Sequence, residues 1–270
     1  YINTIKNASK NEKSLDADTY TNKFSYEAAC FSVASAIKAS QEDNFSLGRP
    51  PGHHATKSRA MGFCLFNNIA IAVQKSVNEG EKVFIIDFDG HHGNGTQDIF
   101  YDTDKVLYLS THQFPAYPGT GWLEEIGTGK GKGFTINIPM PPYAGDDLFL
   151  ETLKNLIPMI KNEFYPDIVA VSAGFDGHHS DPLLQLNLTT NAFYETGKLL
   201  NKNFKSIFAC LEGGYNLDFI HKNIIDFANG INNKNQRYKE NSTKSDNDVK
   251  NDFNVRMSLL KEKLSPYWKL

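Results

Sequence analysis

Apolar residues form short continuous runs that alternate with longer stretches of helical periodicity along most of the chain. A strand covered on both faces of a parallel sheet is continuously apolar, whereas a helix packed on that sheet repeats its apolar positions every three to four residues. The runs predict strands at Phe45 to Leu47, Val83 to Ile86, Val106 to Ser110, Phe134 to Ile138, Ile168 to Ser172 and Ile207 to Leu211. The periodic stretches predict helices at Phe24 to Ala39, Gly62 to Val77, Asp146 to Phe164, Thr189 to Phe204 and Phe253 to Leu264. We therefore predict an α/β fold with a mainly parallel central sheet, in one domain that spans residues 1–270.

Three stretches lack this patterning. Residues 1–20 are polar. The segment from Gly127 to Gly133 alternates glycine with Thr and Lys, but it precedes a strand rather than a helix. We interpret it as a mobile loop and not as a phosphate-binding loop. Residues 232–251 are dominated by Asn, Lys, Ser and Asp, which predicts a solvated polar loop or linker with almost nothing to bury.

Composition narrows the function classes. The chain has 28 Lys and Arg against 31 Asp and Glu, so it lacks the excess of positive charge expected of a protein that binds nucleic acid or a membrane surface. Three scattered cysteines do not form a disulfide framework and suit a reducing compartment. No apolar run reaches the roughly 18 residues of a membrane span. Cytoplasmic location is the default expectation, nuclear location is not excluded, and the sequence leaves the oligomeric state open.

Residues that can bind a metal or catalyse a reaction gather where the predicted strand at Val83 to Ile86 ends. Side chains alternate along an extended segment, so Asp87, Asp89 and His91 should lie on one side. Oxygen and nitrogen ligands without sulfur suit zinc or another first-row divalent ion. The alternative is an acidic strand end that binds calcium, magnesium or nothing. The calcium-loop pattern fails, because it requires glycine where His92 stands.

Other predicted strands end in polar residues of the same kind, and the carboxyl ends of parallel strands lie at one edge of a sheet. Asp89, His91 and Asp176 would give three metal ligands and an open position, as in a catalytic zinc site. His53 and His54 are candidates for the base and the acid, and Tyr215 for stabilising an oxyanion. His178 and His179 are rival ligands, which we interpret as loop histidines.

These residues resemble the zinc-dependent histone deacetylases, in their class II and bacterial branch, and the related acetylpolyamine amidohydrolases. The matching segments, in the family's order, are Arg49 to Ala55, Gly62 to Cys64, Asp87 to Gln97, Pro118 to Gly121, Ala173 to Asp176 and Glu212 to Asn216. The resemblance implies an arginase-like three-layer fold. It also implies hydrolysis of acetyl or acyl groups from lysine side chains of peptides, proteins or small acetylated amines.

The resemblance implies roles residue by residue. Zinc, or iron(II), would bind Asp89, His91 and Asp176. The catalytic residues would be His53 with its partner Asp87, His54 with its partner Asn94, and Tyr215. A carboxylate favours the protonated imidazole and an amide does not, so His54 should be the neutral base and His53 the more cationic histidine. The substrate-binding positions would be Phe63 and Tyr117, which wall a tunnel, together with Gly62, Leu183, Gly214 and, at the rim, Asp16 or Asp18.

Structural potassium is implied at two places. One site would use Asp87 and the backbone of Asp89, His91, Ser110 and Thr111, and the other would use backbone near Phe100, Thr103 and Val106. Family members also begin with further residues that supply a first strand and a rim loop, whereas this sequence starts at Tyr1 inside the pattern. A shortened N-terminal part would expose a sheet edge and open the pocket rim.

Three alternatives remain at this point. An acetylpolyamine amidohydrolase tends to carry a glutamate at the pocket mouth, where this chain has Leu183, so an acyl-lysine substrate is favoured. A weakly active acyl-lysine binding module would not need Tyr215. An arginase-like dimetal hydrolase would need further ligands, whereas Asp176 is followed by Gly177.

Overall fold

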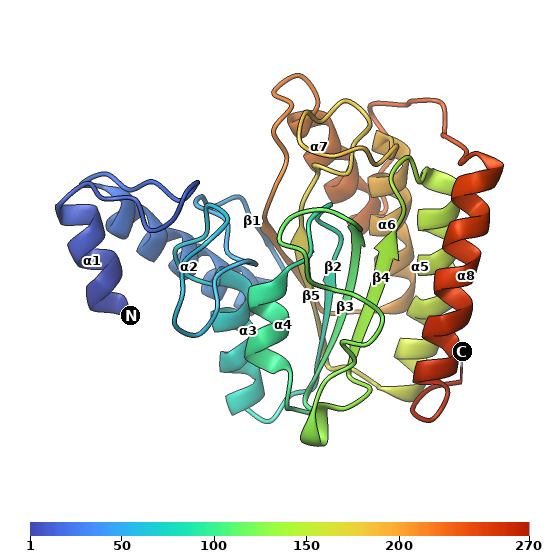
Figure 1. Ribbon diagram of the computed structural model, residues 1–270, viewed down its shortest axis with the longest axis horizontal. Helices are drawn as coiled ribbons and strands as arrows, with labels where there is room; N and C mark the ends of the chain where they lie inside the picture. Colours follow the sequence, from blue (N-terminus) through green and yellow to red (C-terminus); the bar gives the residue numbers. More distant parts are fainter. Residues whose placement is uncertain (270) are drawn as a thin grey trace.

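The computed structural model describes residues 1–269 and contains a six-stranded sheet in which every pairing is parallel. The strands lie in the order β1-β6-β5-β2-β3-β4, as Figure 1 shows in part. Their bounds are β1 Phe45–Ser46, β2 Val83–Asp87, β3 Val106–Gln113, β4 Thr135–Met140, β5 Ile168–Ala173 and β6 Ile207–Leu211. The α/β prediction with a parallel sheet is confirmed, and each predicted strand is present.

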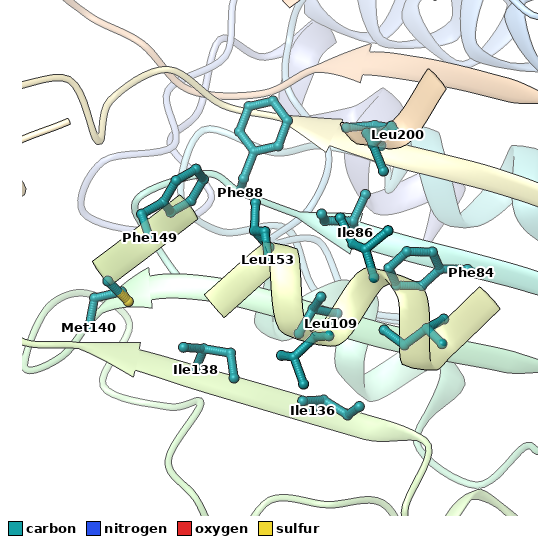
Figure 2. Packing of buried hydrophobic residues seen from close by; sticks show 14 of the residues in the cluster. Phe84, Ile86, Phe88, Leu109, Ile136, Ile138, Met140, Phe149, Leu153 and Leu200 are labelled. Carbon is teal, nitrogen blue, oxygen red and sulfur yellow. The ribbon is translucent and has the colours of Figure 1, made fainter. Parts of the chain in front are cut away.

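Helices cover both faces of the sheet (Figure 1). The bounds are α1 Ile2–Lys10, α2 Ser25–Glu42, α3 Asn68–Asn78, α4 Asn94–Phe100, α5 Asp146–Glu163, α6 Thr190–Asn203, α7 Ile220–Ile231 and α8 Asn247–Leu264. Because successive side chains of a strand point to opposite faces of the sheet, the core against the sheet is divided into two clusters, one on each face. Val83 and Ile85 of β2 pack with residues of α2 and α3, whereas Phe84 and Ile86 belong to the larger cluster formed with α5, α6, α7 and α8. Figure 2 shows this second side, where Phe84 and Ile86 lie near Leu153 of α5.

The helix predicted from Gly62 begins later than expected, so that part of the prediction is wrong. Met61 and Cys64 form a short antiparallel bridge through two backbone hydrogen bonds. Gly62 and Phe63 between them have φ values of 56° and 66°. Positive φ at both central residues is the requirement of a type I′ hairpin turn. The helix α3 starts only after Asn67, whose side chain accepts a hydrogen bond from the backbone N–H of Ala70 and caps it.

The polar segments are more structured than their composition indicated. The predicted polar stretch at the start contains α1, and the Gly127 to Gly133 loop contains a short 3₁₀ helix, η1 Gly129–Gly131. Within residues 232–251, α8 already begins at Asn247. The preceding residues are mostly exposed, as expected, but Ser245 is buried, and the hydroxyls of Ser245 and Thr243 accept backbone N–H groups at the start of α5. These hydroxyls replace the partners that the first turn of a helix lacks.

Within residues 1–269, no helix combines the length and the apolar character needed to cross a bilayer.

Phe193 of α6 tests the core around the end of β2. Its side chain is 0% exposed, and its ring centroid lies 5.8 Å from that of Phe88 and 5.0 Å from that of Phe175. Phe193→Ala should lower the free energy of unfolding by about 3–5 kcal/mol, because it removes a buried ring and leaves a cavity. Phe31→Ala is the matched control, since that ring is 67% exposed, and it should change stability by less than about 0.5 kcal/mol. Equal changes in denaturant unfolding would contradict the assigned packing.

Candidate metal centre and active site

The polar residues that follow the strands lie together where the order in which the chain adds strands to the sheet reverses. From β2 the chain adds β3 and β4 on one side, and then adds β5 and β6 on the other. Ligand sites in parallel α/β sheets lie beyond the carboxyl ends of the strands at such a switch point. Asp89 follows β2, Asp176 follows β5 and Gly213 follows β6, three strands that are neighbours in the sheet. The topology therefore gathers groups that lie up to 124 residues apart in sequence.

Three ligand-type atoms converge there. His91 Nδ1 lies 2.8 Å from Asp176 Oδ2 and 3.4 Å from Asp89 Oδ1. All three ligand atoms lie within 4.8 Å of one another, and all three residues are buried. Ligands at 2.0–2.2 Å from a tetrahedral ion are about 3.3–3.6 Å apart. The arrangement of two carboxylates and one imidazole thus fits one first-row divalent ion, and the structure brings together the three residues that the sequence nominated.

Backbone amides fix the other carboxylate oxygen of each acid. The N–H of Gly213 donates to Asp89 Oδ2 at 2.6 Å, and the N–H of Gly90 donates to Asp176 Oδ1 at 2.7 Å. These bonds leave Asp89 Oδ1 and Asp176 Oδ2 facing His91. Glycine is required beside the carboxylates, because a Cβ on Gly174 would lie 1.9 Å from Asp89 Oδ2. The second oxygen of each acid is therefore occupied by protein, and the first is directed at the ion position.

The titration behaviour reflects this crowding. Burial lowers the pKa of His91, but the charge and hydrogen bond of Asp176 and the contact with Asp89 outweigh it and raise the pKa to about 10. Burial and the neighbouring Asp89 charge raise the pKa of Asp176 to about 6. Without an ion, a proton on His91 therefore holds the two carboxylates together.

The tandem histidines have the two partners expected from the resemblance. His53 Nδ1 lies 3.2 Å from Asp87 Oδ2, and His54 Nδ1 lies 2.8 Å from Asn94 Oδ1. The two rings are in contact, with centroids 4.0 Å apart and planes tilted by 46°. His53 Nε2 is also 3.9 Å from Asp89 Oδ1. His53 thus lies beside the candidate ligands, and the His54 ring centroid lies 6.2 Å from that of His91.

Their pKa values diverge in the expected directions. Burial lowers the pKa of His53, but the charges of Asp89 and Asp87 outweigh burial and raise it to about 10. Burial and the charge of His53 hold the pKa of His54 well below its ordinary value. The two adjacent imidazoles therefore differ in protonation, with His53 cationic and His54 neutral. Acid–base catalysis needs such a difference.

Tyr215 lies on the loop after β6 and is held through its backbone. Its N–H donates to Asp181 Oδ2 at 2.7 Å, and its ring packs edge-on against Phe63 with centroids 5.9 Å apart. Burial raises the pKa of the phenol, and the charges of Asp176 and Asp89 raise it further. The phenol therefore stays protonated and can only act as a neutral donor or acceptor. Gly214 precedes it with φ of 126°, a conformation suited to glycine.

Exposed aromatic rings flank the histidines. Phe63 and Tyr117 are 39% and 41% exposed, and the Tyr117 ring meets the His54 ring edge-on at 5.2 Å. A Cβ on Gly62 would lie 2.5 Å from the His54 ring, so the hairpin turn packs tightly against this histidine. Thr19 Oγ1 accepts a hydrogen bond from the Phe63 N–H, which places the 16–19 turn beside the same rings.

The remaining predicted substrate positions are exposed or half-buried. Asp16 Oδ1 accepts hydrogen bonds from the N–H groups of Asp18 and Thr19, so one oxygen stabilises its own turn. The charges of Asp18 and Asp16 add to burial in raising the pKa of Tyr117 to about 12, which locates both acids near that ring. Leu183 is 46% exposed.

Sequence reasoning missed three supporting side chains. Glu212 is fully buried, and its Oε2 accepts the N–H groups of Gly52 and His53 at 2.7 and 3.1 Å. Burial raises its pKa to about 7. Asp181 holds the Tyr215 backbone, and the Tyr108 hydroxyl donates to Asp87 Oδ2 at 3.0 Å. A signal existed for Glu212, since it directly follows a buried strand, whereas Asp181 lies in a loop and Tyr108 lies inside a strand, so neither is marked by a strand end.

His178 and His179 lie apart from these ligands. Both face Glu240 rather than the Asp89, His91 and Asp176 group. Neither histidine therefore belongs to the group formed by Asp89, His91 and Asp176.

The fold and this site together define the class: an α/β protein with a buried group of oxygen and nitrogen atoms that could hold a metal ion, at the switch point of a parallel sheet. Residues 1–231 match the family model described as the histone deacetylase domain. The chain belongs to this family, and its fold is the arginase/deacetylase fold of the structural relatives.

Similar proteins include a probable deacetylase of Archaeoglobus fulgidus, 41% identical over 231 residues, or 81% of this chain and 64% of that protein. Histone deacetylase 14, chloroplastic, of Arabidopsis thaliana is 43% identical over 206 residues, or 72% of this chain and 49% of that protein. The crystal structure of the HDA15 HD domain aligns with a TM-score of 0.87 at 30% identity, covering 97% of this chain and 75% of that one. The acetylpolyamine aminohydrolase of Burkholderia pseudomallei aligns with a TM-score of 0.76 at 34% identity, covering 81% and 66%. The chain thus spans between about half and two thirds of the length of these two curated relatives.

Proton release should accompany metal binding. His91 Nδ1 must lose its proton to ligate an ion, and its pKa is raised to about 10, so Zn²⁺ added to metal-free protein at pH 7.5 should displace at least one proton. Apparent affinity should therefore rise as pH increases from 7 toward 10, by about tenfold per unit. Calorimetry in buffers of different ionisation enthalpy measures the number of protons. Binding without proton release, or binding at this site unchanged by Asp176→Asn, would contradict the assignment.

Proposed function

We propose that this chain is a zinc-dependent amidohydrolase that removes acetyl or other acyl groups from lysine side chains of peptides or proteins. The observation that carries the proposal is the geometry of three buried ligand atoms, all within 4.8 Å of one another, beside one neutral and one cationic histidine. Membership of the histone deacetylase domain family supports the same reaction.

The residues present fit a zinc ion, because two carboxylate oxygens and one imidazole nitrogen are already aimed at one point. Bound zinc would polarise the acyl carbonyl and acidify a water molecule. Asp89, His91 and Asp176 would be its ligands, and iron(II) would suit the same donors. Asp89 and Asp176 are fixed by the amides of Gly213 and Gly90, so the site needs little reorganisation.

His54 is the proposed base and acid. Asn94 presents a carbonyl oxygen to His54 Nδ1, so that nitrogen carries the hydrogen and Nε2 is left as the acceptor. As the water oxygen attacks the acyl carbon, Nε2 takes the water proton. When the carbon–nitrogen bond breaks, the same proton passes to the leaving amine, which departs as the free lysine side chain. His54 then returns to its neutral form.

His53 and Tyr215 would stabilise the charge that develops on the acyl oxygen and around the attacking water. The carboxylate of Asp87, 3.2 Å from His53 Nδ1, favours the cationic form of His53, which would supply positive charge in a buried site. The Tyr215 phenol keeps its proton and can donate a hydrogen bond to the oxyanion. Phe63 and Tyr117 would line the path of the substrate's methylene chain, with Gly62 and Gly214 allowing close approach.

A monovalent cation site near Asp87 is part of the proposal. Ser172 pairs with Asp87 in the neighbouring strand, and its buried hydroxyl oxygen has no hydrogen-bond partner. An orphaned oxygen beside a buried carboxylate fits a cation such as potassium, which prefers oxygen ligands. The second potassium site, near Phe100, Thr103 and Val106, stays a prediction from the resemblance.

The alternative substrate is an acetylated polyamine, since one structural relative is an acetylpolyamine aminohydrolase. Leu183 offers no charge at the mouth for a cationic chain, which favours acyl-lysine in a peptide. Asp16 or Asp18 at the rim would bind the peptide backbone.

Turnover on paired substrates tests the function. Purified, zinc-loaded protein should hydrolyse a fluorogenic acetyl-lysine peptide with higher kcat/KM than acetylated putrescine, and a chelator should abolish both activities. Tyr215→Phe should lower kcat by roughly 10²–10³-fold with a smaller effect on KM, because its donor acts on developing charge. Preference for the polyamine would favour the alternative substrate. Binding of the acyl peptide without turnover would favour a binding module.

Asn94→Asp tests the assignment of His54. A carboxylate at this position favours the imidazolium, so the pKa of His54 should rise and the acidic limb of the pH–rate profile should move to higher pH, by about one to three units. Asn94→Ala is the control, because it removes the acceptor without adding charge. It should slow the reaction without moving that limb upward. An acidic limb that stays in place in Asn94→Asp would rule out this pairing.

A further inference from the structure

A second group of metal-ligand side chains lies outside the active site. His178 and His179 are on the loop between β5 and α6, and Glu240 is on the segment between α7 and α8. His178 Nε2 lies 3.0 Å from Glu240 Oε2, and His179 Nε2 lies 3.3 Å from Glu240 Oε1. These ligand atoms all lie within 4.8 Å of one another. Two imidazole nitrogens thus face the two oxygens of one carboxylate, and the proposed reaction uses none of the three.

The spacing suits a small divalent ion. Ligands at 2.0–2.2 Å from a tetrahedral ion are about 3.3–3.6 Å apart. The two observed nitrogen–oxygen distances, 3.0 and 3.3 Å, lie at or slightly below the short end of this range. The two rings lie side by side, with centroids 4.4 Å apart and an interplanar angle of 32°, so their Nε2 atoms point the same way. The His178 side chain is 1% exposed, whereas those of His179 and Glu240 are 39% and 22% exposed. One side of the group is therefore open to an entering ion and to water ligands.

Neighbouring groups orient two of the three ligands. Ser180 Oγ lies 2.7 Å from His178 Nδ1, and the Ser180 N–H donates to the same nitrogen at 3.3 Å, so without an ion the ring hydrogen is on Nε2 and faces Glu240. An ion would displace this hydrogen from Nε2, and Ser180 Oγ can accept a hydrogen on Nδ1 in that tautomer. The N–H of Thr190, at the start of α6, donates to Glu240 Oε2 at 2.7 Å. The side chain of Asn191 bonds the Glu240 carbonyl oxygen. Both ligands are thus held in place by atoms other than the ion.

We propose that His178, His179 and Glu240 form a second divalent-metal site, which binds Zn²⁺ or a similar first-row ion with two imidazole nitrogens and one carboxylate. An ion there links the loop after β5 to the segment before α8. The same loop carries Asp181, which holds the Tyr215 backbone. The site is therefore structural, and it ties the polar segment to the part of the chain that supports the active site.

The competing explanation is a hydrogen-bonded clamp in which both Nε2–H groups donate to Glu240 and no ion binds. The two differ in metal stoichiometry. Metal-free full chain, titrated with Zn²⁺ against a chromophoric chelator, should bind two ions per chain. Asp176→Asn, which damages the first site, should retain one of them, and Glu240→Gln should also retain one. The double variant should retain none.

Glu240→Gln keeps the size of the side chain and an acceptor for the Thr190 N–H, so it removes ligand charge with little change in packing. His221→Gln is the matched control, because this exposed histidine of α7 belongs to neither group of ligand-type side chains, and it should still bind two ions. Zn²⁺ should raise the melting temperature of Asp176→Asn but not that of the double variant. If the variants fail to fold, the number of ions that the unmutated chain binds still tests the proposal. Binding of one ion per chain would overturn the proposal. So would a Glu240→Gln variant that still binds a second ion with an affinity within tenfold of that of the unmutated chain.

Discussion

Buried charge at the switch point of the sheet is the constraint on which the rest of this structure depends. Asp87, Asp89 and Asp176 are fully buried, and an ionised carboxylate out of water is costly unless it is paired and hydrogen-bonded. The pairing runs between strands. The amide of Gly90, after β2, holds Asp176 after β5, and the amide of Gly213, after β6, holds Asp89 after β2. The same bonds that satisfy the acids therefore fix three strand ends relative to one another.

This charge pattern extends outward to the histidines. Asp87 and Asp89 keep His53 cationic, and the cation of His53 helps keep its neighbour His54 neutral. Glu212 holds the backbone of Gly52 and His53 from the end of β6. The 50–54 loop is thus positioned by charge from the metal centre and by a carboxylate from an adjacent strand. The difference in pKa between two sequence neighbours is a consequence of this burial, and the proposed proton transfer depends on it.

The strands and the gathering of Asp89, His91 and Asp176 could be predicted because both follow from local patterns. A continuous apolar run specifies a buried parallel strand, and polar residues at its end specify the functional edge. The hairpin at Gly62 could not be read in this way, because its surrounding residues also match a helical period. Its turn carries Phe63 at positive φ, where Asn or Gly is usual. The contacts of Glu240 and Ser245 were missed because their partners are distant in sequence: Glu240 meets His178 across 62 positions, and Ser245 meets Gly145 across 100.

The loop after β5 connects the features that the sequence presented separately. It begins with Asp176 in the candidate metal centre, continues through His178 beside Glu240, and reaches Asp181, whose Oδ2 accepts the N–H groups of Tyr215 and Asn216. Asn216 in turn donates to the Ser180 carbonyl oxygen at 2.7 Å. The proposed oxyanion donor is therefore attached through its backbone to the same short loop that supplies a ligand. Because these contacts fix backbone as well as side chains, the relative placement of Asp176 and Tyr215 depends on the conformation of residues 176–181, and the polar segment that contacts this loop contributes to the geometry of the site.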